Sequence, residues 1–233
     1  MILIASAAYL DAEFQIEFGR IPPAFLPIGN RRLYERQLVA IKNKFPDEDI
    51  YISLPDSYEL SKKDAVYFDR EKIRVIFNPS DLQLGSSILQ AISAMIATSD
   101  GKQFRLLHGD TLLFDMPDEL DVISVAETNK EYSWEVESSS DYSESVWCGF
   151  FSFANPEFFE ECLKVNGDSF LGAVYQYDKK NGLLRLPAYS WLDFGHINMY
   201  FRSRSKLTSE RFFNELVIEH GCVKKSGFPF SKI

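Results

Sequence analysis

The sequence predicts one α/β domain over residues 1–233, with a mainly parallel sheet covered by helices on both faces. The first half alternates short apolar runs, typical of buried parallel strands, with longer amphipathic stretches, typical of helices. The second half is richer in β segments, which indicates a β-rich insertion on the substrate face. The 233 residues are 45% hydrophobic and 15% aromatic, which is enough for one large core.

In the first half, we expect strands at residues 2–8, 49–54, 73–78 and 103–110, and helices at 30–45, 58–68 and 85–101. The first of these helices has Tyr34, Leu38 and Ile41 at helical spacing, and Asn30 is placed to cap its start. The segment between the first strand and Ile28 contains a glycine and three prolines, so we expect no helix there.

In the second half, we expect β segments at 121–128, 132–138, 145–154 and 182–187. Helices are expected at 156–165 and 169–180, and a further one begins near His196.

The composition argues against several classes of protein. A net charge of −9 does not suit a surface that binds nucleic acid or an anionic membrane. No apolar run reaches the roughly 18 residues that a membrane helix needs, and the apolar N-terminus has no basic leader. Cys148, Cys162 and Cys222 show no close pairing and predict free thiols in a reducing compartment. We therefore expect a cytoplasmic protein.

A Gly-Asp pair follows the fourth predicted strand. In open α/β sheets, ligands bind beyond the carboxyl ends of the strands, where Asp110 is expected to lie. Gly109 allows a close approach of a ligand to the backbone, and a carboxylate at this place can hold Mg²⁺, which prefers oxygen ligands. The alternative is that Asp110 caps the turn that follows the strand.

Asp193, in the segment WLDFGH, is a second carboxylate candidate. A two-carboxylate Mg²⁺ site would explain its place, and the alternative is that it caps the helix that begins near His196. Gly-Asp after the fourth strand and Trp-x-Asp-x-Gly further along the chain are more informative together than either is alone.

Five segments, in this order, resemble the sugar-phosphate nucleotidyltransferase family. They are PPAFLPIGNRRLYERQL (22–38), LQLGSSILQAI (82–92), LLHGDTLL (106–113), VWCGFFSFANPEFFEE (146–161) and WLDFGHINMY (191–200). The resemblance covers about residues 2–203. It implies a Rossmann-like, three-layer αβα fold related to glycosyltransferase-A.

The resemblance also implies a reaction. It joins a nucleoside triphosphate to a phosphorylated sugar or alcohol and releases pyrophosphate, mainly through positioning and through charge neutralisation by Mg²⁺. By the same resemblance, Asp110 and Asp193 would be the metal ligands. The nucleotide would be bound by Ala7, Ala8, Gln83, Gly85 and Ser86, and the acceptor by Gly149 and Trp191.

The sequence departs from the family pattern where the triphosphate should bind. The family's Gly-x-Gly-x-Arg loop is replaced by AAYLDAEF at residues 7–14, and its Pro-Lys pair is replaced by two prolines at 22–23. We expect Arg20, or one of the pair Arg31 and Arg32, to replace the lysine in catalysis, because arginine binds phosphate well and the pair lies at a predicted helix start. The alternative is that all three are solvated surface charges.

The segment EFGRIPPAFLP further resembles divergent members of the family from bacterial capsule and surface-polysaccharide gene clusters. The tail RFFNELVIEHGCVKKSG is similar to theirs as well, and Glu17, Phe18 and Gly19 would then belong to a subfamily site. The pattern leaves open a homo-oligomer, and a fused C-terminal domain for which residues 1–233 would be the N-terminal part.

Two other functions remain open at this stage. One is a glycosyltransferase of the related fold that uses a nucleotide sugar; its Asp-x-Asp motif has only Asp110 with Asp115 as a candidate, at the wrong spacing. The other is a non-catalytic regulatory or scaffold domain, which the lost glycines and lysine favour. The sequence does not decide between CTP, UTP and dTTP, or between a sugar and a polyol phosphate.

Overall fold

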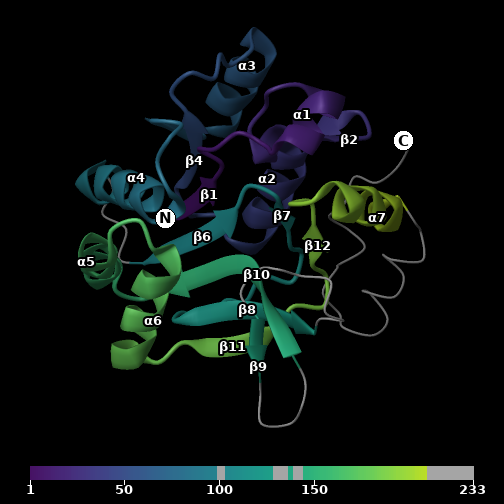
Figure 1. The fold of residues 1–233 in the computed structure, drawn as a ribbon. Helices are drawn as coiled ribbons and strands as arrows, with labels where there is room; N and C mark the ends of the chain where they lie inside the picture. Colours follow the sequence, from purple (N-terminus) through teal and green to yellow (C-terminus); the bar gives the residue numbers. More distant parts are fainter. Residues whose placement is uncertain (99–102, 128–135, 139–143, 209–233) are drawn as a thin grey trace.

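The computed structural model describes residues 1–98, 103–127, 136–138 and 144–208 (Figure 1). Its main sheet has the strand order β11-β8-β10-β6-β1-β4-β5, with β9 paired to β10. These strands are β1 (Ile2–Ala5), β4 (Ile50–Pro55), β5 (Arg74–Asn78), β6 (Phe104–His108), β8 (Val122–Glu127), β9 (Val136–Ser138), β10 (Glu144–Phe153) and β11 (Leu184–Pro187). Among these strands only β10 runs against the others. The sheet is therefore mainly parallel, as predicted.

Strand β1 lies at the centre of the parallel part. It pairs with β4 through Ile2 and Ile50, and with β6 through Ile2 and Arg105. Its first three residues are buried because helices cover both faces of the sheet, which explains a continuous apolar run instead of an alternating one.

Helices cover both faces of the sheet (Figure 1). One core lies under α1 (Ala12–Phe18), α2 (Leu33–Lys44), α3 (Lys62–Glu71) and α7 (Ile197–Leu207). The other lies under α4 (Leu84–Thr98), α5 (Pro156–Asn166) and α6 (Phe170–Asn181). The predicted three-layer αβα architecture is confirmed.

Two short ribbons and one turn complete the described elements. The ribbons are β2 (Pro27–Ile28) with β3 (Arg31–Arg32), and β7 (Thr111–Leu112) with β12 (Leu192–Asp193). A 3₁₀ turn, η1, spans Pro23–Phe25. The second ribbon matters most here, because it joins the segment after β6 to a segment near the end of the described chain.

Two expectations about the N-terminal region are wrong. Helix α1 lies in the segment where we expected none. Asp11 caps it by accepting a hydrogen bond from the backbone N–H of Phe14, and it ends at Gly19 (φ +77°). The three prolines come after this point and do not disturb it. Helix α2 begins after Arg32, not at Asn30, and the Glu35 carboxylate accepts from the backbone N–H of Arg32.

The β-rich second half extends the central sheet, because β8 and β10 join it beside β6. Of the expected segment 132–138, only β9 lies within the described residues. No helix among the described residues is long and apolar enough to span a bilayer. Cys148 and Cys162 are buried free thiols, and Cys222 lies outside the described part.

Candidate active site

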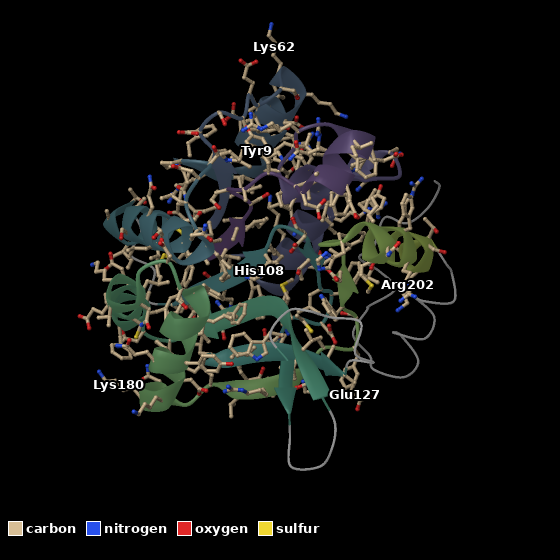
Figure 2. The ribbon with its side chains drawn as sticks, viewed as in Figure 1. Tyr9, Lys62, His108, Glu127, Lys180 and Arg202 are labelled. Carbon is tan, nitrogen blue, oxygen red and sulfur yellow. The ribbon has the colours of Figure 1, made fainter. Side chains whose placement is uncertain are left out.

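A cavity of about 450 Å³ opens at the carboxyl ends of β1 and β6. Its walls come from the loop after β1, the segment before α4, the β6–β7 turn, the middle of β10 and the turn between β12 and α7. His108, at the end of β6, lies near the centre of the molecule (Figure 2). This is the place where open α/β sheets bind ligands.

Two carboxylates meet in this cavity. Asp110 lies in the β6–β7 turn and Asp193 ends β12, and both line the wall. A Cβ atom placed on Gly195 would lie 2.9 Å from Asp110 Oδ2 and 3.2 Å from Asp193 Oδ1. The two carboxylates thus face one small volume, and the residue beside them must be glycine to leave it open.

The backbone of the β7–β12 ribbon holds this pair together. Asp193 is the ladder partner of Thr111, and the N–H of Phe194 donates to the carbonyl oxygen of Asp110 at 2.8 Å. Asp193 Oδ1 accepts from Gly195 N at 2.8 Å, and its carbonyl oxygen accepts from Ser203 Oγ at 2.6 Å. Asp193 therefore orders its own turn and does not cap α7, whose N-cap is His196.

The site concentrates negative charge. Burial, and after it the nearby charge of Asp110, raises the pKa of Asp193 to about 6. The Asp110 carboxylate accepts no hydrogen bond from the described residues, so it does not cap the turn there. A divalent cation would remove the repulsion between the two carboxylates, and the donor set fits Mg²⁺, which proteins commonly hold through one or two carboxylates plus substrate phosphates. Within the described ranges, no larger His, Cys, Asp and Glu cluster could hold a metal.

Backbone donors without a hydrogen bond in the described chain line the same cavity as the carboxylates. Ala7 and Ala8, which the resemblance assigns to the nucleotide, line the cavity. Their N–H groups make no hydrogen bond within the described part of the chain. Unpaired successive N–H groups are what a glycine-rich loop offers to phosphate, so the loss of the glycines does not remove the donors.

The three arginines lie outside the cavity wall. The Arg20 guanidinium stacks on the ring of Tyr9, 3.9 Å from its centroid, next to the loop that carries Ala8. Arg32 Nε lies 3.0 Å from the buried carboxylate of Asp64. Among the described residues no lysine or arginine lines the cavity. A phosphate-binding role for Arg20, Arg31 or Arg32 stays a prediction. Of the three, Arg20 contacts Tyr9, which follows Ala8 in the loop after β1.

Two of the predicted nucleotide-binding residues dock α4 onto the α5–α6 loop. A Cβ atom on Gly85 would lie 2.6 Å from the carbonyl oxygen of Asp168, and Ser86 Oγ donates to Asp168 Oδ1 at 2.5 Å. Neither lines the cavity, whereas Gln83 does. Ser87, which the sequence did not indicate, also lines it.

Both predicted acceptor residues, Gly149 and Trp191, line the cavity. Gly149 lies where the register of β10 against β8 shifts, and its φ of +78° favours glycine. A Cβ atom there would also lie 2.7 Å from Thr111 Oγ1. The glycine is therefore required twice, by backbone conformation and by close packing.

The remaining polar residues have local explanations. Burial lowers the pKa of His108 more than the charge of Asp110 raises it, and the His108 ring packs on Phe151. Asp115, the second carboxylate of the glycosyltransferase alternative, accepts from the backbone N–H of Tyr189 at 2.8 Å and does not line the cavity. Phe18, of the proposed subfamily site, packs on Tyr200 of α7 at a ring distance of 5.0 Å.

Comparison with known proteins agrees with this architecture. No protein-family model and no curated protein matches the sequence. Among solved structures, the chain is similar to a nucleoside-diphosphate-sugar pyrophosphorylase from Vibrio cholerae RC9, with a TM-score of 0.62 and 14% identity over 88% of this chain and 100% of that one.

Two further structures share the fold. HddC from Yersinia pseudotuberculosis has a TM-score of 0.61 and 14% identity over 88% of this chain and 98% of its own. The inositol-1-phosphate CTP transferase from T. maritima has a TM-score of 0.61 and 12% identity, over 90% and 96%. The chain has the fold of these pyrophosphorylase and CTP transferase structures.

Proposed function

We propose that the protein is a Mg²⁺-dependent nucleotidyltransferase that joins a nucleoside triphosphate to a phosphorylated sugar or polyol and releases pyrophosphate. The observation that carries the proposal is the convergence of Asp110 and Asp193 in the cavity at the carboxyl ends of β1 and β6. The fold supports it, since proteins of this fold are described as pyrophosphorylases and CTP transferases. HddC, which shares the fold, has been solved complexed with GMP-PN.

Each wall of the cavity has a role in this reaction. Asp110 and Asp193 would hold Mg²⁺, which when bound neutralises charge on the phosphates. The N–H groups of Ala7 and Ala8 donate to phosphate oxygens, and Gln83 faces the nucleoside. The acceptor enters beside Gly149 and Trp191, so that its phosphate can attack the α-phosphorus in line.

Arg20 supplies the cation nearest the phosphate loop in this proposal. It replaces the lysine that the family pattern has and this sequence lacks. A role in capsule or surface-polysaccharide synthesis, and a place in the cytoplasm, rest on the resemblance of EFGRIPPAFLP to divergent family members.

One observation favours a second candidate, a non-catalytic domain of the same fold. Apart from the residues that the structure does not describe, the cavity wall contains no lysine or arginine, although a triphosphate carries several negative charges. A domain that had lost catalysis would keep the cavity and lose its cations.

Pyrophosphate release separates the two candidates. The protein is incubated with each nucleoside triphosphate, Mg²⁺ and a panel of sugar and polyol phosphates. Asp110→Asn and Asp193→Asn should each abolish turnover, and Asp118→Asn, an exposed carboxylate paired with Lys44, should not. Absence of turnover with every pair of substrates, together with absence of triphosphate binding, would favour the non-catalytic domain.

A further inference from the structure

Gln37 is a polar residue buried on the core face of α2. Its exposed fraction is 0%, and Leu33, Leu38 and Ile41 of the same helix lie in the apolar core around it. Buried amides of this kind are kept only where they make specific hydrogen bonds, so the partners of Gln37 show what it does.

The side-chain amide of Gln37 reaches the turn that carries Asp110. Its Nε2 atom lies 2.7 Å from the carbonyl oxygen of Thr111, 3.1 Å from that of His108 and 3.2 Å from that of Gly109. All three neighbours are acceptors, so the NH₂ end must face them. The three carbonyl groups bracket Asp110 on both sides along the chain.

Packing does not explain this residue. Gln37 Oε1 is buried and has no hydrogen-bond partner, and an unsatisfied buried acceptor is unfavourable. A leucine or methionine would fill the same space in the core without that cost. The amide is therefore explained by its contacts with the turn and not by the stability of α2.

The position of the Asp110 carboxylate depends on the backbone of its turn more than the position of the Asp193 carboxylate does. The Asp193 carboxylate is oriented by a hydrogen bond from Gly195, whereas the Asp110 carboxylate accepts none from the described residues. Its position follows from the backbone alone, which the N–H of Phe194 holds on one side and Gln37 on the other.

We propose that Gln37 is a positioning residue for the metal site: it clamps the backbone of the β6–β7 turn and so sets the distance between the Asp110 and Asp193 carboxylates. This inference rests on the proposed function, in which that pair binds the metal ion. Groups that orient metal ligands from outside the coordination sphere typically change metal affinity or activity by about 10–100-fold when they are removed.

The test compares two variants on the same helix. Gln37→Met keeps the volume and removes all three contacts. Tyr34→Phe, one turn earlier, removes a buried hydrogen bond to Asp64 Oδ1 (2.7 Å) that lies outside the cavity. Mn²⁺ is titrated into each full-length protein by calorimetry, the EPR spectrum of bound Mn²⁺ is recorded, and kcat and KM are measured where turnover exists. Thermal unfolding reports how far each variant loses stability.

We expect Gln37→Met to weaken Mn²⁺ binding at least about tenfold, to change the Mn²⁺ EPR spectrum, and to lower kcat more than it raises KM. Tyr34→Phe should bind Mn²⁺ as the wild type does, even where its melting temperature falls equally. If Gln37→Met does not fold, Gln37→Asn serves instead, because it keeps the amide and withdraws it by one methylene from the turn.

Equal Mn²⁺ affinities and equal EPR spectra for Gln37→Met and Tyr34→Phe would overturn the inference. A wild-type protein that binds Mn²⁺ without transferring nucleotide would contradict the proposed function, and the Mn²⁺ measurements would still decide the role of Gln37. A wild-type protein that binds no Mn²⁺ would overturn both.

Discussion

Asp193 lies directly opposite Thr111 in the β7–β12 ribbon. This pairing places the last residue of one strand beside the first residue of the other, and so brings Asp193 next to the turn that carries Asp110. Backbone pairing brings the two carboxylates into one volume. Neither carboxylate forms a salt bridge with a lysine or arginine of the described chain.

The first prediction concerns the pH dependence of the metal-free protein. Asp193 has a pKa of about 6 in the folded state, above the ordinary value near 3.9 for an unfolded chain. The folded state therefore binds more protons between these values, and stability falls as pH rises from about 4 to 6. Asp193→Asn should remove this loss and stabilise the protein at pH 8 by about 1–3 kcal/mol.

Urea unfolding in EDTA at several pH values measures this effect. The wild type and Asp193→Asn should differ more at pH 8 than at pH 4.5. If the free energies of unfolding of the two proteins changed in parallel over this pH range, the pKa of Asp193 would not be raised in the folded state.

The second prediction concerns Gly195. A Cβ atom there would lie too close to both carboxylates, 2.9 Å from Asp110 Oδ2 and 3.2 Å from Asp193 Oδ1. Gly195→Ala should therefore push the carboxylates apart and weaken Mg²⁺ binding by at least about tenfold, with little change in the fold. Isothermal titration with Mg²⁺ measures it, and Ser205→Ala, on the exposed side of α7, is the control. Unchanged Mg²⁺ affinity in Gly195→Ala would mean that the ion binds elsewhere.

The third prediction concerns Gly149. Its positive φ and its contact with Thr111 Oγ1 both oppose a side chain, so Gly149→Ala should destabilise the fold by about 1–3 kcal/mol. Thr111→Ala removes the contact but leaves the backbone strain. The double variant should therefore be more stable than the sum of the single effects predicts, by about 0.5–1 kcal/mol. Strict additivity in urea unfolding would show that the contact contributes nothing.

The fourth prediction separates two arginines. Arg32, 36% exposed, pairs with the buried carboxylate of Asp64, which also accepts from Tyr34, so Arg32→Gln should destabilise the protein by about 1–2 kcal/mol. Arg20 is exposed and stacks on Tyr9 beside the loop that carries Ala7 and Ala8, so Arg20→Gln should leave stability nearly unchanged and, under the proposed function, weaken triphosphate binding about tenfold. Thermal unfolding and nucleotide titration of both variants measure these effects. The reverse pattern would assign the phosphate to Arg32.

The architecture was predictable because each strand and helix leaves a local pattern. Asp110 and Asp193, which the structure brings into one cavity, could be named from the sequence, because Asp110 follows an apolar strand and Gly109, and Asp193 follows an apolar pair and precedes Phe194-Gly195. Helix α1 is the exception, because three prolines in the same segment indicate a loop, although they constrain only the residues after Gly19.

Other features depend on contacts that no local pattern contains. Helical spacing places Gln37 beside Tyr34 and Ile41, but it does not name the partner of its amide, because Thr111 lies 74 residues away in the chain. Ser86 was expected to face the nucleotide, but the tertiary contact with Asp168 turns it toward the α5–α6 loop. Such pairings arise from the packing of distant elements, which sequence periodicity does not report.

Calorimetric titration of each nucleoside triphosphate, in excess Mg²⁺ and again in EDTA, shows whether the cavity binds a triphosphate through a metal ion. With two carboxylates and, among the described residues, no lysine or arginine in the cavity wall, a bare triphosphate should be repelled. We expect one triphosphate to bind with Mg²⁺ and to lose at least about a hundredfold in affinity in EDTA, on the order of 3 kcal/mol. Equal affinity in the two conditions, or no binding of any triphosphate, would contradict this expectation.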